Sequence, residues 1–354
     1  MTTATIGATG LACPTPALGA DRVQLGHGSG GRMSAALFRE RFLPHLDNPV
    51  LRLLGDAAVL DVAGTGIAFS TDTFVVSPLE FPGGNIGSLA VHGTVNDLAM
   101  MGAQAMALSA GFVLEEGLPF DVLDRIVAAL GRAAAAAGVM VATGDTKVVE
   151  RGKAEGLYLN TTGVGILSPG FRPAPDQARP GDRVLVSGPI GRHGIAVMAA
   201  RGAIDFEVDV ESDSAALWPL VAALRSAAGG EVHVLRDPTR GGVASALNEI
   251  AQASRVGVAL VGDTIPIPEP VAGACEMLGF DPLYVANEGV LVAVVGADAA
   301  RAALDALRGH PLGAEAAEVG QVVEAHPGMV VLKTGIGGTR VVDLLPGEQL
   351  PRIC

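Results

Sequence analysis

The strongest constraint on the fold is an alternation of strand-like and helix-like apolar segments that occurs twice along the chain. The first series lies within residues 22–167 and the second within residues 181–338. In each series, short runs rich in Val, Ile and Ala alternate with segments of helical periodicity. The sequence therefore predicts an α/β (α+β) protein with two domains that face each other across a ligand-binding cleft.

The predicted elements can be placed from this periodicity and from the flanking Gly and Pro residues. The first domain should contain a strand–turn–strand at 57–72, a helix near 86–101, a strand near 104–113, a helix after Pro119, and strands near 139–143 and 157–166. The second should contain strands at 183–187, 232–236, 256–261 and 290–295, with helices between them, and then a helix at 299–308 and two short strands.

Three further segments complete the predicted domain organisation. Residues 168–180 (SPGFRPAPDQARP) contain four prolines and should form a stiff linker between the domains. Residues 1–21 are rich in small residues, Pro, Gly and Thr, so we expect a mobile N-terminal extension. Residues 339–354 should form a flexible tail, and its last residue is Cys354.

Composition excludes several classes of partner and environment. With 49% apolar residues the chain can form a sizeable core, whereas 24 Lys and Arg against 37 Asp and Glu give a net charge of −13, which disfavours nucleic acid. The longest uncharged stretch, residues 98–114, is short for a membrane span. Three cysteines without metal-ligand spacing favour a reducing compartment, and an export signal is not apparent. We expect a cytoplasmic protein.

Aspartates at the ends of apolar elements provide the clearest signal of chemistry. Each one alone would be interpreted as a helix cap or a turn residue, but five together indicate an oxygen-ligand site for Mg²⁺ and a nucleotide. The five residues are Asp56, Asp72, Asp97, Asp145 and Asp237. We assign the metal to Asp56, Asp72, Asp97 and Asp237, with Asp145 able to replace one of them, because spacing alone does not rank the five.

The motif GHGSGG at residues 26–31 matches the GxGxxG pattern, but it does not follow a clear strand or open a complete βαβ unit. A dinucleotide fold is therefore rejected, and a GxxxxGK[ST] phosphate loop is absent from the sequence. A Gly-rich loop still exposes backbone N–H groups that can bind phosphate, although such a loop is often only a turn.

Two other charged residues are candidates for catalysis. Lys147 is the only lysine in the first 152 residues, which favours a phosphate or substrate contact over a merely solvated position. Glu288 precedes an apolar run that should be a buried strand. A buried carboxylate beside a cleft can act as a base, although helix capping and ion pairing are its more common roles.

Several blocks of this sequence together resemble the HypE family of hydrogenase maturation factors. The resemblance extends from about Leu25 to Cys354, and the blocks are HGSGG, GDAAVL, FSTDTFVVSPLEFPGGNIGSLAVHGTVNDLAMMGA, GFVLEEGLP, GDTKVVERG, DPTRGGV, ANEG and the terminal PRIC. Many of them also fit the wider superfamily of aminoimidazole-ribonucleotide synthetase, selenophosphate synthetase and thiamine-monophosphate kinase. The terminal PRIC is what separates the HypE family from these relatives.

The resemblance implies a fold and an activity. It implies an aminoimidazole-ribonucleotide-synthetase-like architecture, in which the N-terminal domain binds ATP and forms a homodimer and the C-terminal domain carries the tail. A separate carbamoyltransferase would place a carbamoyl group on Cys354, and ATP-dependent dehydration would convert this group to a thiocyanate. The cyanide would then pass to a scaffold on which the iron centre of NiFe hydrogenase is assembled.

The matched blocks also imply roles for individual residues. Cys354 would be the covalent carrier, Lys147 would orient the carbamoyl group, and Glu288 would take its proton. The implied nucleotide-binding residues are His27, Gly28, Ser29, Gly30, Gly31, Asp145, Thr146, Lys147, Thr239 and Arg240. His92 also lies in a matched block, whereas the remaining histidines, His193 among them, are interpreted as surface or core residues.

Some alternatives remain open at this level. The chain could be another ATP-dependent synthetase or kinase of the superfamily that acts on a free small molecule. It could instead be a non-enzymatic metal-delivery scaffold with Cys354 as a ligand, although one soft ligand is thin evidence for that. Arg352 could offset the terminal carboxylate or dock the tail. Cys275 should lie in the core, and Cys13 belongs to the predicted extension.

Overall fold

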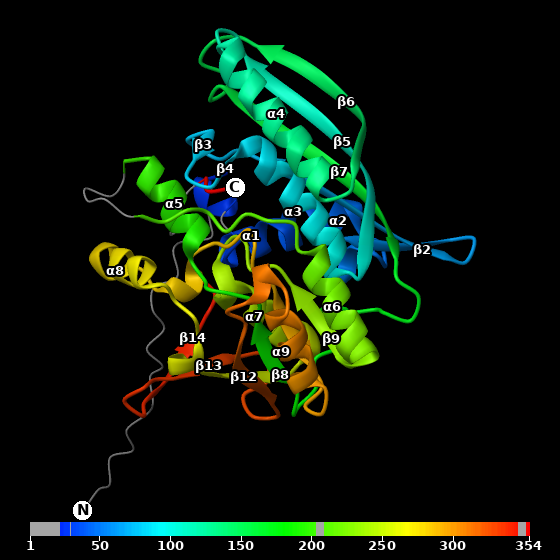
Figure 1. Ribbon diagram of the computed structural model, residues 1–354, viewed down its shortest axis with the longest axis vertical. Coiled ribbons are helices and arrows are strands. Elements are labelled where there is room, and N and C mark those ends of the chain that lie inside the picture. Colours follow the sequence, from blue (N-terminus) through cyan, green and yellow to red (C-terminus); the bar gives the residue numbers. More distant parts are fainter. Residues whose placement is uncertain (1–21, 29, 203–208, 346–351) are drawn as a thin grey trace, which may run out of the picture.

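The computed structural model describes residues 22–28, 30–202, 209–345 and 352–354. It contains two α/β domains, and the C-terminal end of the chain lies close to their junction (Figure 1). The predicted two-domain architecture is thus observed. The predicted extension at residues 1–21, and Ser29, lie outside the described residues.

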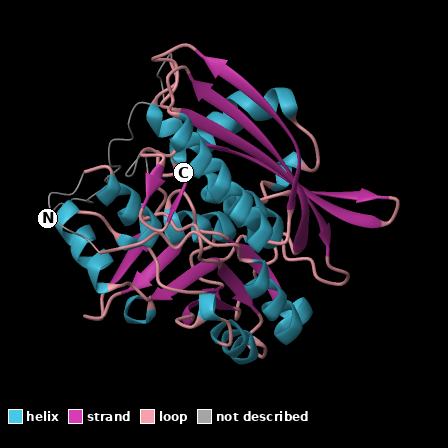
Figure 2. Ribbon diagram, turned by 45° about the horizontal axis from the view of Figure 1, so that its top comes forward, coloured by secondary structure: helices cyan, strands magenta, loops and turns pink. Residues whose placement is uncertain are grey.

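The N-terminal domain is built on a five-stranded sheet in which only β5 and β6 run parallel to each other. In sheet order its strands are β1 (Ala58–Val62), β2 (Thr65–Phe74), β7 (Leu157–Leu167), β5 (Ala103–Glu115) and β6 (Met140–Val149). Helix α3 (Ile86–Met100) packs on this sheet, and α4 (Phe120–Ala136) packs on α3 and β6 (Figure 2). A short hairpin, β3 (Glu80–Phe81) and β4 (Gly84–Asn85), leads into α3.

Helix α3 is the element that carries Asp97 into the cleft. It begins at a capping box, because the Asn85 side chain accepts the N–H groups of Gly87 and Ser88 while the Ser88 hydroxyl accepts the N–H of Asn85. Most of its residues are buried, which explains why the helix is apolar nearly all round. It ends before Gly102, whose φ of +75° favours glycine.

The C-terminal domain is built on a mixed sheet of seven strands. In sheet order these are β14 (Thr339–Val342), β13 (Val330–Lys333), β10 (Gly257–Val261), β12 (Ala317–Val323), β8 (Arg183–Val186), β11 (Val292–Val295) and β9 (Val232–Arg236). Its helices are α5 (Arg192–Ala200), α6 (Trp218–Ala228), α7 (Gly242–Ser254), α8 (Glu269–Leu278) and α9 (Ala300–Arg308).

Strand β11 shows why the apolar run before Gly296 is continuous. Val292 and Val294 pack into one core with α7, whereas Ala293 and Val295 pack into a second core with α6 and α9. Successive side chains of a strand point to opposite faces, so a strand covered on both faces is apolar at every position.

Residues before the first sheet strand lie against the C-terminal domain. They form α1 (Arg32–Leu37), a π-helical turn (Phe38–Phe42) and α2 (Leu43–Leu46). Arg32 forms an ion pair with Asp343, and its backbone N–H donates to the carbonyl of Leu345. The predicted N-terminal domain at residues 22–167 therefore includes a segment that contacts the other domain.

The predicted linker and the start of the predicted tail are both packed against the rest of the protein in the structure. In the linker at residues 168–180, Phe171 is buried in the core that also holds Met100 of α3, so the linker packs between the domains. The predicted flexible tail is wrong at its start, because β14 pairs with β13 and Val342 is buried. Residues 346–351 lie outside the described part, whereas Arg352, Ile353 and Cys354 are placed.

The described ranges contain no helix that is both long and apolar enough to cross a membrane.

Candidate active site

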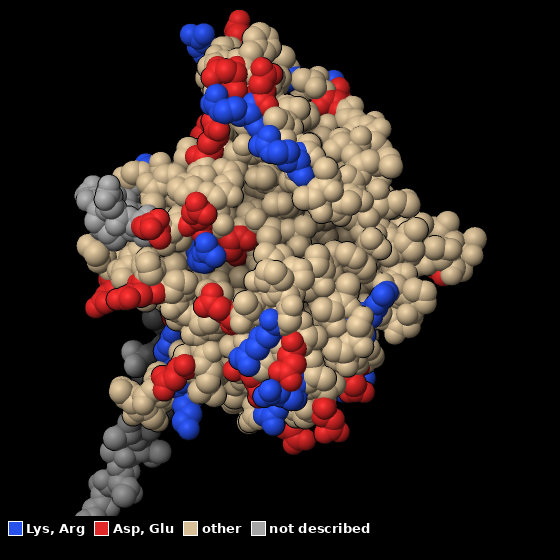
Figure 3. All heavy atoms as spheres, in the orientation of Figure 1, with Lys and Arg blue, Asp and Glu red and all other residues tan. Residues whose placement is uncertain are grey.

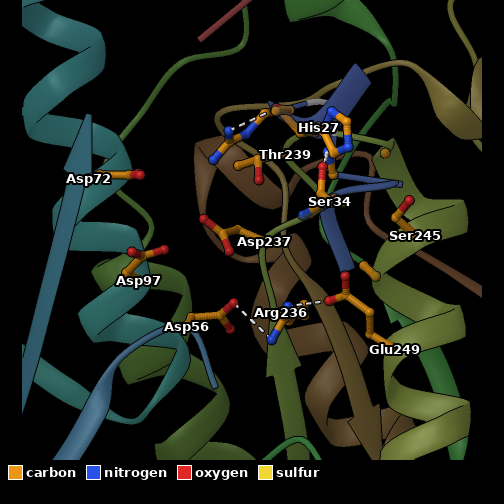
Figure 4. A pocket seen from close by; sticks show the side chains of 16 residues that line it. His27, Ser34, Asp56, Asp72, Asp97, Arg236, Asp237, Thr239, Ser245 and Glu249 are labelled. Atoms are coloured by element: carbon orange, nitrogen blue, oxygen red, sulfur yellow. Dashed lines mark hydrogen bonds and ion pairs between the residues drawn. The ribbon is translucent and has the colours of Figure 1, made fainter. Parts of the chain in front are cut away.

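Four of the five predicted aspartates meet at a pocket between the two domains. This interdomain pocket has a volume of about 330 Å³ and is lined by Asp56, Asp72 and Asp97 on one side and by Asp237 on the other. Asp56 precedes β1, Asp72 lies on β2, Asp97 lies on α3, and Asp237 follows β9. Figure 4 shows the three N-terminal carboxylates facing the segment that carries Asp237 and Thr239.

Three of these aspartates lie close enough together to hold one cation. Oxygens of Asp56, Asp97 and Asp237 all lie within 4.8 Å of one another, whereas Asp72 lines the pocket without belonging to that group. Ser70 Oγ donates to Asp97 Oδ2 at 2.6 Å and so orients this carboxylate. Hard oxygen ligands converging from separate elements suit Mg²⁺.

The electrostatics of the cluster also fit a cation. Burial raises the pKa of Asp56 to about 8 and that of Asp237 to about 6, and neighbouring carboxylates contribute to both shifts. Burial and the charges of Asp237, Asp72 and Asp56 raise the pKa of Asp97 well above its usual value. Arg236 forms ion pairs with Asp56, at 3.0 Å, and with Glu249, and so offsets part of the negative charge of the cluster. A bound cation would offset much of the remainder.

A helix N-terminus and a Gly-rich segment adjoin the carboxylates. Helix α7 begins directly after Gly241, whose φ is +79°, and Ser245 in its first turns has a buried hydroxyl without a partner among the described residues. The Gly-rich segment lies opposite, where Arg240 donates to the carbonyl of Gly28 at 3.1 Å. A helix N-terminus with free donors is suited to bind an anion.

Most of the predicted Gly-rich loop does reach this region. His27, Gly28 and Gly30 line the interdomain pocket together with the predicted Thr239 and Arg240. Gly30 needs to be glycine, because its φ is +78° and a Cβ would approach the Arg240 backbone oxygen to 2.9 Å. Gly31 lies outside this lining and borders a neighbouring hollow beside α1.

The chain end is docked next to the carboxylates. Cys354 lies beside Asp72, Thr239, Arg240 and Glu288 in a terminal pocket with about 20 Å³ of free space, room for about one water molecule. The segment after β2 holds the chain end, since Val75 N–H donates to the backbone carboxylate oxygen of Cys354 at 3.2 Å and Ser77 N–H donates to the Arg352 carbonyl at 3.3 Å.

The docked thiol is kept protonated by its surroundings. Burial raises the pKa of Cys354 to about 12, and Glu288 and Asp72 add to this shift, which Arg240 opposes. Arg352 forms an ion pair with Glu155, and its carbonyl accepts from Arg201 at 2.8 Å. Of the two roles left open for Arg352, these contacts favour docking of the chain end.

Glu288 is placed as a potential base. Its side chain is 2% exposed, and its Oε1 has no hydrogen-bond partner among the described residues. Burial raises the pKa of Glu288 well above its usual value, and the charges of Asp237, Asp213 and Asp72 add to this effect. An unpaired buried carboxylate beside a reactive group is typical of a catalytic base.

The predicted Asp145, Thr146 and Lys147 are not brought to either pocket within one chain. They lie on β6, at the edge of the N-terminal sheet, where Lys147 pairs with Asp145 at 2.7 Å and both side chains are about 70% exposed. The predicted nucleotide contacts of these three residues, and the predicted place of Lys147 beside the carbamoyl group, are therefore not formed within a single chain. His92 also lines neither pocket. Its Nδ1 contacts Ser214 Oγ at 2.9 Å, and burial lowers its pKa to about 4.

Sequence reasoning missed several residues that the structure brings to the site. Arg236 and Glu249 form an ion-pair bridge from Asp56 to α7, Ser70 orients Asp97, and His193 contacts the chain end. Arg236 directly precedes the DPTRGG motif, and Ser70 lies two residues before Asp72, so proximity to these motifs was the available signal. His193 had no comparable signal.

The fold and the site define a class of protein. Residues 54–167 match the AIR synthase related protein, N-terminal domain, and residues 179–333 match the AIR synthase related protein, C-terminal domain. Carbamoyl dehydratase HypE of Rhizobium leguminosarum bv. viciae is 53% identical over 333 residues, which cover 94% of this chain and 95% of that protein.

Solved structures agree with these sequence matches. A structure of HypE in complex with ATP is 49% identical with a TM-score of 0.79, and the match covers 93% of this chain and 99% of that chain. A chain of a HypE–HypF complex is 44% identical with a TM-score of 0.83, covering 88% and 100%. The chain belongs to the HypE family of carbamoyl dehydratases, which confirms the resemblance stated from its motifs.

Proposed function

We propose that this chain uses ATP and Mg²⁺ to dehydrate a carbamoyl group on its own Cys354 sulfur to a thiocyanate. The observation that carries this proposal is the docking of Cys354 beside Glu288 and Arg240, at the edge of the carboxylate pocket. The HypE relative bound to ATP supports the choice of nucleotide. The site thus combines a covalent carrier, a base and a place for phosphates.

The terminal pocket holds the free thiol of Cys354 in a form that is a poor nucleophile. A pKa of about 12 leaves almost no thiolate in the docked state at neutral pH, and the thiolate is the nucleophile. Loading of the carbamoyl group should therefore take place with the chain end undocked. An S-carbamoyl group carries no charge, so the burial that suppresses ionisation does not oppose its docking.

The reaction then needs two changes at the carbamoyl group. Transfer of the γ-phosphoryl group to the carbamoyl oxygen converts that oxygen into part of a good leaving group. One N–H proton leaves as the oxygen is phosphorylated, and loss of the second with departure of phosphate forms the C≡N bond, so ATP and the S-carboxamide give ADP, phosphate and the thiocyanate. Glu288 Oε1 is free to accept one of these protons, and Arg240 can stabilise negative charge beside the sulfur.

The nucleotide and metal would occupy the interdomain pocket. Asp56, Asp97 and Asp237 would hold Mg²⁺, and Asp72 is available as a further ligand. When bound, the ion supplies positive charge that offsets the phosphates and the clustered carboxylates. The N-terminus of α7, together with His27, Gly28 and Gly30, would bind phosphate oxygens.

Partners follow from this chemistry. The carbamoyl group has to come from a carbamoyltransferase, and the HypE–HypF complex of a relative supports such a partner. The cyanide has to pass to an acceptor, which we propose to be the scaffold for the hydrogenase iron centre. We place these reactions in the cytoplasm.

We also propose that the chain forms a homodimer through the open face of its N-terminal sheet. Large apolar side chains are exposed on the strands of this sheet, including Phe69, Met106, Met140 and Ile166. On the face shown in Figure 3, charged side chains are sparse over β2 and β5–β7. An exposed apolar patch of this kind marks an interface. A dimer would also bring β6, with Asp145 and Lys147, to a second chain.

Asp97→Asn should separate nucleotide binding from stability. Residues that only orient a metal ligand are worth roughly 10- to 100-fold in metal affinity, so loss of a ligand should weaken Mg²⁺–ATP binding by at least about a hundredfold. The same change removes one of several clustered buried charges, so the midpoint of thermal unfolding without metal should rise. Calorimetric titration and thermal unfolding measure both effects. Asp61→Asn, on exposed β1, is the matched control, and normal ATP binding by Asp97→Asn would remove Asp97 from the metal site.

Phe69→Asp should dissociate the proposed dimer. Phe69 is 42% exposed on β2, so the change leaves the core intact while placing a charge in the apolar patch. The association should weaken by at least about 2 kcal/mol, and sedimentation at micromolar concentration should show mainly monomer. Asp61→Lys, on the neighbouring strand, tests whether a changed surface charge outside the patch has this effect. A variant Phe69→Asp that remains dimeric would place the interface elsewhere.

Phosphate release tests the proposed function directly. Protein loaded with carbamoyl groups should release one phosphate per loaded chain in a single turnover with ATP and Mg²⁺, whereas unloaded protein should release far less. A synthetase acting on a free small molecule would show no dependence on loading, and a metal-delivery scaffold would hydrolyse no ATP. Either result would contradict the proposal.

A further inference from the structure

A buried histidine contacts the chain end through one ring nitrogen and the protein interior through the other. His193 lies in the first turn of α5 and is 0% exposed. Its Nε2 lies 2.6 Å from the Ile353 carbonyl oxygen, and its Nδ1 lies 2.8 Å from Ser212 Oγ. Phe81 packs edge-on against the ring, with 5.4 Å between ring centroids. These contacts hold both ring nitrogens and pack the ring against Phe81.

The hydrogen-bonding partners fix the protonation of this ring. A carbonyl oxygen can only accept, so Nε2 carries the hydrogen and donates it to Ile353. Ser212 Oγ accepts the N–H of Ser214 at 3.1 Å, which leaves its own hydrogen free to be donated to Nδ1. Burial lowers the pKa of His193, in keeping with this neutral tautomer. The Ser212 hydroxyl thus selects the form of His193 that can donate to the chain end.

The segment that orients His193 also holds the proposed base. Asp213 Oδ2 accepts the backbone N–H of Glu288 at 3.1 Å and that of Gly289 at 2.9 Å. Ser214 contacts His92 of α3, so the same three residues also contact the N-terminal domain. Residues 212–214 therefore connect the contact to the chain end with the backbone that places Glu288.

We propose that His193, oriented by Ser212, is a positioning residue that holds the end of the chain in its docked state, with Cys354 beside Glu288. This inference rests on the proposed function, because docking matters only if the sulfur reacts in the terminal pocket. Loss of the contact should raise the fraction of undocked chain ends. Dehydration, which needs the docked state, should then slow, while loading by the carbamoyltransferase should not.

Two amide substitutions can test which ring nitrogen matters. The amide nitrogen of His193→Gln can reach the position of Nε2 and keep the donor to Ile353. In His193→Asn the amide ends near the position of Nδ1, so the contact with Ser212 can persist while the donor to Ile353 is lost. Both variants remove the ring and its contact with Phe81, so they form a matched pair.

The first readout is alkylation of unloaded Cys354 by iodoacetamide, followed by mass spectrometry of the C-terminal peptide. A docked thiol is buried and protonated, so the rate reports the undocked fraction. One lost hydrogen bond should raise the rate about three- to tenfold in His193→Asn, and the rate in His193→Gln should stay within about twofold of wild type. Equal rates in the two variants, or wild-type rates in both, would overturn the proposal.

Ser212→Ala provides a second variant that removes no ring from the core. It should also raise the alkylation rate, because Nδ1 loses the donor that selects the correct tautomer. Ser254→Ala is the control, since Ser254 likewise accepts a backbone N–H, from Ala178, and donates to a backbone carbonyl, that of Pro175. Unchanged alkylation in Ser212→Ala, or an equal rise in Ser254→Ala, would contradict the role of Ser212.

The second readout compares loading with dehydration. In preloaded His193→Asn the rate of thiocyanate formation divided by the alkylation rate should fall about three- to tenfold, because this quotient follows the ratio of docked to undocked chain ends, and ATP affinity should stay at the wild-type value. An unchanged quotient, with dehydration rising in step with alkylation, would overturn the positioning role. If wild-type protein itself forms no thiocyanate, the proposed function fails, whereas the alkylation rates still decide whether His193 holds the chain end.

Discussion

Cys354→Ala is expected to bind Mg²⁺–ATP with wild-type affinity and to form neither the carbamoylated nor the thiocyanate product. The thiol lies at the edge of the aspartate cluster, and the group of carboxylates that could hold a cation does not include it. Its removal should therefore leave the nucleotide site intact. Covalent loading, in contrast, has no substitute nucleophile at the chain end. Mass spectrometry of the C-terminal peptide and calorimetric titration with ATP measure the two properties.

Cys275→Ala is the matched control for this variant. Cys275 is buried in α8, and burial raises its pKa to about 11, so it should not accept the carbamoyl group. The substitution should lower the free energy of unfolding by about 1 kcal/mol through the cavity it leaves, while product formation stays normal. Carbamoylation of Cys354→Ala at another cysteine would contradict the assignment of the carrier.

Glu288→Gln is expected to accept the carbamoyl group and then accumulate it in the presence of ATP. The amide keeps the size of the side chain but has no basic oxygen, and loss of a general base typically slows a reaction by about 10²- to 10⁴-fold. Loading involves an undocked chain end, so its rate should not change. Quenched single-turnover samples, analysed by mass spectrometry, resolve the loaded and dehydrated forms.

Glu276→Gln, an exposed position on α8, controls for the loss of one negative charge and should behave as wild type. Wild-type thiocyanate formation by Glu288→Gln would remove Glu288 from the mechanism. A loss of carbamoyl loading in Glu288→Gln would instead indicate that the pocket also takes part in the transfer from the partner.

The carboxylate cluster could be predicted because each aspartate lies at or near an end of an apolar element, and such ends meet where two α/β domains face each other. Asp56, Asp97 and Asp237 do converge in this way. Sequence spacing did not rank Asp72 and Asp145, since position along an element does not determine which face of it meets the other domain. The distances between side chains made that distinction.

Lys147 could not be placed from the sequence for a physical reason. It follows Asp145 in a motif of the matched family, but β6 lies at the edge of its sheet, and the two residues pair with each other in the solvent. A residue that acts in a neighbouring chain and one that acts in its own chain give the same sequence pattern. Only an oligomeric structure distinguishes them.

The segments near the end of the chain are held by contacts that the sequence pattern did not indicate. Residues 339–342 were expected to be flexible because they lie near a terminus, yet Val342 is buried in a strand next to β13. His193 was interpreted as a core or surface residue because its partner Ile353 is 160 residues away in the sequence. Local patterns predict elements, whereas contacts between distant segments depend on packing that the patterns do not contain.

The mass of the C-terminal peptide before and after addition of ATP tests the central claim most directly. Protein first loaded by the carbamoyltransferase should carry one carbamoyl group on the peptide that ends in Cys354. After a single turnover with ATP and Mg²⁺, the account predicts that this peptide becomes lighter by the mass of one water molecule, with one ADP formed per chain. A peptide that keeps its carbamoyl mass while ATP is hydrolysed would contradict the account.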